Sequence, residues 1–71
     1  MKKPLPTWVR DDNTVVACTE KIKVMLENFD EIGQLMQDAF EDGVLMEVSE
    51  AQMREALLAL VNALKNPYTK A

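Results

Sequence analysis

The chain has 71 residues, of which 48% are hydrophobic and 28% are charged, and its formal net charge at pH 7 is −4. This composition is typical of folded globular proteins and excludes the polar, highly charged class of disordered chains. A chain of this length forms one domain at most, and its core is marginal unless a partner supplements it. We therefore expect a folded protein that assembles with another molecule.

The single cysteine, Cys18, excludes an internal disulfide and suits a reducing compartment, so the cytoplasm is the expected location. The start of the chain carries two lysines, but two prolines follow them where a signal peptide needs an apolar segment. The longest nearly apolar stretch, residues 56–64, is about half of the roughly 20 residues that a membrane span requires. We expect neither export by a signal peptide nor insertion into a membrane.

Residues 1–13 hold two prolines and a polar run, which predict an irregular, extended N-terminal arm. We expect Trp8 and Val9 of this arm to fold back onto a helix. A long helix is predicted from about residue 14 to about residue 42, because its apolar positions alternate at spacings of three and four, the heptad pattern of packed helices. These positions are Val15, Cys18, Ile22, Met25, Phe29, Ile32, Met36 and Ala39.

Two glycines fall near this pattern. Gly33 lies inside it, where it weakens the helix but lets another backbone approach closely, so it is interpreted as a helix-crossing point. Gly43 follows the pattern and is expected to end the helix by adopting a left-handed conformation.

A second, shorter helix is predicted over about residues 50–65. Ser49 and Gln52 form a capping box, and Val48 and Met53 form the hydrophobic staple that accompanies one. The helix is expected to end before Pro67. Its apolar face consists of Met53, Leu57, Leu60, Val61 and Leu64.

These elements predict an all-α fold, an antiparallel helical hairpin over residues 14–66 between the arm, 1–13, and a tail, 67–71. At about 1.5 Å per residue the helices span about 42 Å and about 25 Å, so the second cannot cover the whole of the first. We therefore predict a homodimer that forms a four-helix bundle. Its core and dimer contacts are expected at Val15, Cys18, Ile22, Met25, Phe29, Ile32, Met36, Leu57, Leu60 and Leu64.

The residue inventory argues against an enzyme, since the chain has no histidine for acid–base work and only one cysteine. One cysteine cannot build a closed zinc site. The segment around Gly43 superficially resembles a calcium-binding loop, but Phe40 and Ser49 stand where two oxygen ligands are needed. No metal or cofactor is therefore predicted. Cys18 is interpreted as a core residue, with a reactive thiol near Lys21 as the alternative.

Charge is unevenly distributed along the chain. Residues 26–56 contain nine carboxylates and a single cation, Arg54, whereas lysines gather near the two termini. The acidic segment is either a solvated surface or a docking site for a basic protein. Nucleic acid is not the expected partner, because its recognition needs a concentrated basic face.

The connection between the helices is unusually apolar. Its apolar side chains either cover the end of the bundle or present a patch to another protein. The second reading makes the acidic end of the hairpin a candidate partner-binding surface. Its residues are Asp38, Glu41, Asp42, Val44, Leu45, Met46 and Glu47.

The sequence thus predicts a non-enzymatic protein-interaction module or regulatory subunit that acts as a homodimer. Two alternatives stay open. The first is a nucleic-acid-binding regulator of the helical-hairpin type that uses the terminal lysines. The second is a thiol-dependent redox element that uses Cys18.

Overall fold

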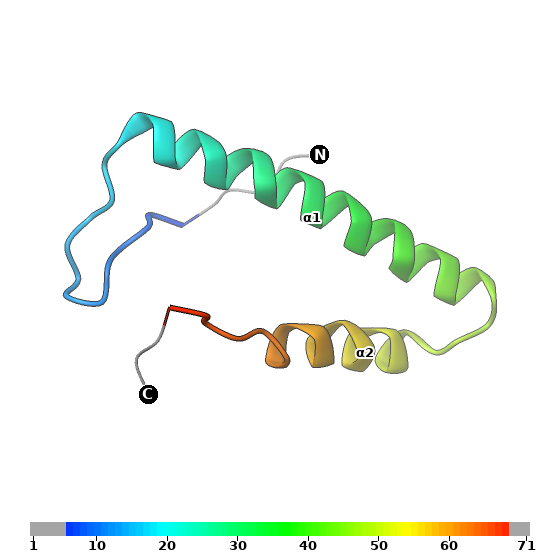
Figure 1. Ribbon diagram of the computed structural model, residues 1–71. Helices are drawn as coiled ribbons and strands as arrows, with labels where there is room; N and C mark the ends of the chain where they lie inside the picture. The colour runs from blue at the N-terminus through cyan, green and yellow to red at the C-terminus, as the bar shows by residue number, and fades with distance from the viewer. Residues whose placement is uncertain (1–5, 69–71) are drawn as a thin grey trace. The chain divides into compact units, whose positions relative to one another are not determined.

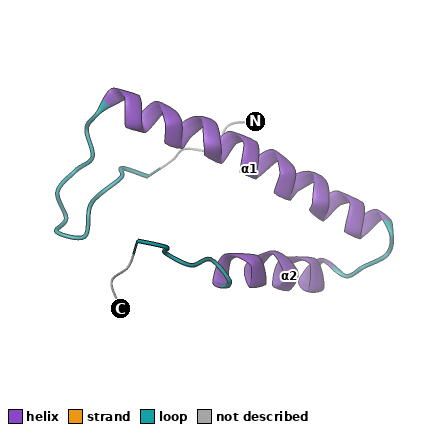
Figure 2. Cartoon of the chain, viewed as in Figure 1, coloured by secondary structure: helices purple, strands orange, loops and turns teal. Residues whose placement is uncertain are grey.

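The computed structural model describes residues 6–68, which contain two helices, α1 (Thr19–Leu45) and α2 (Glu50–Asn62), and no strand (Figures 1 and 2). The predicted all-α, hairpin-like fold is confirmed for this part of the chain. The molecule divides into two compact units, Met1–Leu35 and Met36–Ala71, with the division inside α1.

The first unit begins with a tight turn that replaces the predicted start of the long helix. Val9 and Val15 form an isolated antiparallel bridge, and the Val16 N–H donates to the Trp8 carbonyl oxygen over 2.9 Å. The Asp12 carboxylate accepts from the backbone N–H and the hydroxyl of Thr14, at 3.0 and 2.6 Å. This polar run was predicted to start the helix near residue 14, and it forms a turn instead because Asp and Asn serve both purposes.

Helix α1 begins five residues later than predicted. The Cys18 carbonyl oxygen accepts the first helical hydrogen bond, from the Ile22 N–H over 3.0 Å, and Thr19 is the first helical residue. Asn13, inside the preceding turn, has a φ of 69°, which is left-handed and incompatible with a helix start at that point. Val15 and Cys18 therefore lie outside the helix, and the predicted heptad pattern applies only from Ile22 onward.

The arm folds back onto α1 within the first unit, as predicted. The Trp8 and Phe29 ring centroids are 5.3 Å apart with an interplanar angle of 41°, a tilted contact within the favoured range for aromatic pairs. Because Phe29 lies in the third turn of α1, this contact holds the arm along the first part of the helix.

In the second unit, α1 continues past Gly43 to Leu45 and ends in a Schellman motif. The Val48 N–H donates to the Gly43 carbonyl oxygen and the Glu47 N–H to that of Val44, both over 2.9 Å. Glu47, with a φ of 71°, is the left-handed residue. The prediction that Gly43 would take this role near residue 42 is therefore wrong. Gly43 lies inside α1. Its lack of a side chain instead makes room for Met53 of α2.

Helix α2 begins as predicted and ends earlier. The Ser49 hydroxyl oxygen accepts a hydrogen bond from the Gln52 N–H over 3.1 Å, which confirms the N-cap. The predicted end near residue 65 is wrong, because the helix stops at Asn62. The Leu64 N–H donates to the Val61 carbonyl oxygen, a tightened turn that leads the chain out of the helix before Pro67.

Candidate functional site

Residues 6–68 bury no large apolar side chain, and Gly43 is their single buried residue. Of the ten predicted core or dimer residues, only Met25 and Leu57 are half-buried. The others are exposed in one copy of the chain. These exposed residues are Val15, Cys18, Ile22, Phe29, Ile32, Met36, Leu60 and Leu64. These eight side chains therefore form no buried core among the described residues, although Trp8 contacts Phe29.

The turn after α1 presents two apolar side chains to solvent. Leu45 is 82% exposed and Met46 is 71% exposed, whereas Val48, two residues on, is half-buried. The Schellman geometry explains this difference, because it reverses the chain at Glu47 and directs Val48 back toward the helices. The exposures rule out the reading in which Leu45 and Met46 cover the end of the hairpin within one chain. Val44 is also exposed, though less so.

Four carboxylates lie within a few residues of these two side chains in the sequence, and we call the combined set the acidic turn. It consists of the predicted partner-binding residues Asp38, Glu41, Asp42, Val44, Leu45, Met46 and Glu47. The last turn of α1 contains no basic residue, and the negative end of the helix dipole lies there as well. Glu41 accepts a hydrogen bond from the Gln37 side chain over 2.8 Å, and Asp38 also has an interaction within the chain. The acidic turn therefore combines exposed apolar groups with a negative potential.

Arg54, the one cation of residues 26–56, contacts an aromatic ring. Its guanidinium carbon lies 5.0 Å from the centroid of the Phe40 ring, a cation–π distance. This contact belongs to the second unit, where Phe40, Met53 and Leu57 are half-buried and Met53 packs against Gly43.

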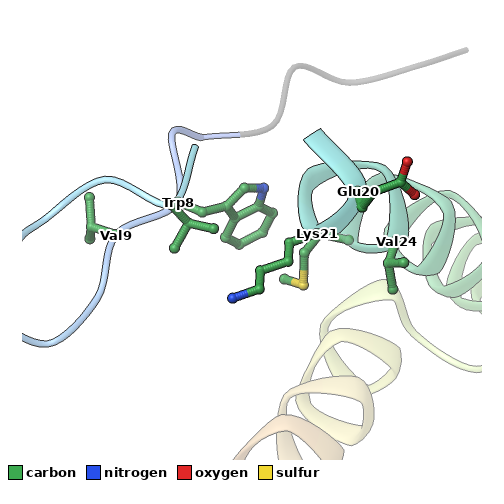
Figure 3. A pocket seen from close by; sticks show the side chains of 7 residues that line it. Trp8, Val9, Glu20, Lys21 and Val24 are labelled. Atoms are coloured by element: carbon green, nitrogen blue, oxygen red, sulfur yellow. The ribbon is translucent and has the colours of Figure 1, made fainter. Parts of the chain in front are cut away.

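The first unit contains an apolar pocket of about 520 Å³ that the sequence did not predict (Figure 3). Trp8 approaches it from the arm, and Lys21 and Val24 approach it from α1. Its lining consists of Trp8, Val9, Val16, Glu20, Lys21, Val24 and Met25. The one signal in the sequence was the apolar pair Trp8 and Val9 in an otherwise polar arm. The tight turn that brings Val16 beside them was not recognised.

Cys18 is exposed and immediately precedes α1. Hydrogen bonds from the backbone N–H groups of Lys21 and Glu20 lower the pKa of its thiol, and the positive charge of Lys21 lowers it further. The predicted place of Cys18 in a helical seam is therefore wrong. Its sulfur instead lies at the positive end of the helix, where a thiolate is favoured.

Within residues 6–68, no group of three or more His, Cys, Asp or Glu side chains is placed to hold a metal ion, and neither helix is long and apolar enough to cross a membrane. The chain matches no protein-family model, no curated protein and no solved structure.

Proposed function

We propose that this chain is a non-enzymatic interaction module that acts as a homodimer and docks on a basic protein partner through the acidic turn. The observation that carries the proposal is the lack of any buried large apolar side chain in residues 6–68 of a chain that is 48% hydrophobic. Such a chain gains stability chiefly by covering these side chains with another molecule. A four-helix bundle of two copies covers them with the fewest components.

Self-association is tested by sedimentation equilibrium of the full chain at micromolar concentration. The expected mass is twice the 8.0 kDa of one chain. A monomer that unfolds cooperatively would overturn the homodimer, because it would show that one copy is stable without covering its apolar surface.

The acidic turn has the composition of a specific docking surface. Its exposed Leu45 and Met46 supply apolar anchors, and the carboxylates around them attract a positively charged partner. We place the module in the cytoplasm, because an accessible lone thiol at Cys18 suits a reducing compartment.

Docking is tested with a synthetic amphipathic peptide of leucine and lysine as the probe. The double variant Leu45→Ala, Met46→Ala should bind it at least about fivefold more weakly, by faster dissociation. The matched control is Leu58→Ala, because Leu58 is also exposed but lies on α2, outside the acidic turn. Equal affinity of both variants would overturn the docking site. Steeply salt-dependent binding of RNA by the unchanged chain would favour the nucleic-acid alternative.

A further inference from the structure

We propose that the apolar pocket of the first unit, here called the arm pocket, binds a fatty carboxylate. The hydrocarbon tail lies between Trp8 and α1, and the carboxylate lies beside the ammonium group of Lys21. This inference goes beyond the proposed function and is independent of it, because the arm pocket lies wholly within Met1–Leu35 and the acidic turn lies within Met36–Ala71.

The arm pocket has the size and the lining of a small-molecule site. Its volume of about 520 Å³ falls within the range of about 300–1,000 Å³ that is typical of such sites. Five of its seven lining residues are apolar, and none has a hydroxyl or amide side chain that would hydrogen-bond a polar substituent. Val9 and Val24 in this lining are 55% and 54% exposed, so they leave apolar surface for a ligand to cover. The part of the ligand that enters the pocket is therefore a plain hydrocarbon tail.

Lys21 is the one cation in the lining of the arm pocket. In Figure 3 its side chain extends toward the arm, whereas the carboxylate of Glu20 points away from Trp8. Lys21 also lies in the first turn of α1, where unpaired N–H groups form the positive end of the helix. Both features favour an anionic head group and oppose a cationic one.

The order of charges along α1 explains why Glu20 does not neutralise Lys21. Glu20, Lys23 and Glu27 follow one another at spacings of three and four, so these three side chains share one line of the helix. Lys21, Val24 and Asn28 share another line by the same rule, and this line carries no carboxylate. The two carboxylates therefore lie closer to Lys23 than to the ammonium group that faces the pocket.

The charged groups of the tight turn in the arm are engaged within that turn. The Asp12 carboxylate accepts two hydrogen bonds from Thr14, and the Arg10 guanidinium donates to the Val15 carbonyl oxygen over 3.0 Å. A single ammonium group at the pocket matches a single carboxylate, whereas the phosphates of a nucleotide need several cations. The ligand class is thus a monocarboxylate with an apolar tail.

Binding is tested by titrating the full chain with decanoate, kept below its micelle concentration, while the fluorescence of Trp8, the single tryptophan, is recorded. The emission should move to shorter wavelength and saturate at one decanoate per chain, because the tail displaces water from the half-buried indole. Acetate, which lacks the tail, should produce no shift. An emission spectrum that decanoate leaves unchanged would overturn the inference, and so would equal shifts with acetate.

The role of charge is tested with decanol and decylammonium, which carry the same tail on a neutral and on a positive head group. Decanoate should bind the most tightly and decylammonium the most weakly, since the head group lies beside a cation. Equal affinities for the three probes would indicate an apolar surface without selectivity and would overturn the carboxylate.

Lys21→Gln should raise the dissociation constant for decanoate roughly three- to tenfold and leave that for decanol within about twofold. Lys23→Gln is the matched control, because it removes the same charge two residues away, outside the pocket lining, and it should change neither value more than about twofold. Equal effects of the two variants on decanoate would show that net charge rather than the pocket attracts the ligand, and would overturn the inference.

Val24→Asp places a carboxylate in the lining and should weaken decanoate binding at least about tenfold. Leu35→Asp makes the same change at a position of α1 that is 69% exposed and outside the pocket, and it should change the affinity little. Circular dichroism checks that both variants keep their helix content. If Val24→Asp loses helix, Lys21→Gln decides the question, because it alters only an exposed head group. Equal affinities of a folded Val24→Asp and Leu35→Asp would overturn the site.

Discussion

The side chain of Met53 fills the space that a methyl group at Gly43 would occupy. An ideal Cβ at Gly43 would lie 2.8 Å from Met53 Cγ and would collide with Met53 Sδ. This contact packs α2 against α1 in the second unit, at the one buried residue of the described chain.

Gly43→Ala should therefore destabilise the protein by up to about 2 kcal/mol. Alanine is the better helix former by about 1 kcal/mol, but overpacking costs about 1–3 kcal/mol, and Met53 Cγ lies only two bonds from its own backbone and cannot move away freely. Urea unfolding gives the free energy. Gly33→Ala is the control, because it has open space and should stabilise dilute, monomeric protein by up to about 1 kcal/mol. A gain at Gly43 equal to that at Gly33 would show that Met53 yields easily.

Glu47→Gly should stabilise the protein by about 1 kcal/mol. Glu47 has a φ of 71°, and a left-handed conformation costs a non-glycine residue about 1–2 kcal/mol, part of which the flexibility of glycine in the unfolded chain offsets. Glu55→Gly, in the interior of α2, should instead lower stability by about 1 kcal/mol. Thermal unfolding of the two variants side by side checks the prediction, and a lower melting temperature for Glu47→Gly would contradict it.

Trp8 and Phe29 should show a coupling of about 0.5–1.5 kcal/mol in a double-mutant cycle with leucine at each position, because their rings are in tilted contact. Trp8 is the only tryptophan, so its fluorescence reports on the same contact. Phe29→Leu should shift the emission toward that of exposed indole. Additive effects together with unchanged emission would mean that the arm does not rest on Phe29 in solution.

Cys18 should react with a thiol reagent faster at neutral pH in the folded chain than in urea. The N–H groups of Lys21 and Glu20 lower the pKa of its thiol, so the thiolate fraction at a given pH is larger in the folded state. The rate measured against pH should reach half its maximum at a lower pH in the folded chain. Lys21→Ala should shift this midpoint upward only in part, because the backbone N–H groups stay in place. Coincident folded and unfolded profiles would contradict the prediction.

Signals that act within a few residues were readable from the sequence. Ser49 caps α2 because its hydroxyl meets a donor three residues away, and no distant part of the chain alters that geometry. The α1 pattern from Ile22 onward was equally local, since a period near 3.6 specifies a helix wherever it is sustained. The arm contact of Trp8 followed from the cost of leaving a large aromatic ring in water.

For residues that can play either of two local roles, only the tertiary structure decided which role they take. Asp12 can accept from a helix N-terminus or from its own turn, and the pairing of Trp8 with Val16 decides for the turn. Gly43 can end a helix or admit a neighbour, and Met53 decides for the neighbour. The sequence by itself determined that α1 has an apolar side. Trp8 and Met53 contact residues that are distant from them in the sequence, and these contacts decided which part of that side stays free. No local sequence pattern encodes such contacts, because packing depends on distances in three dimensions.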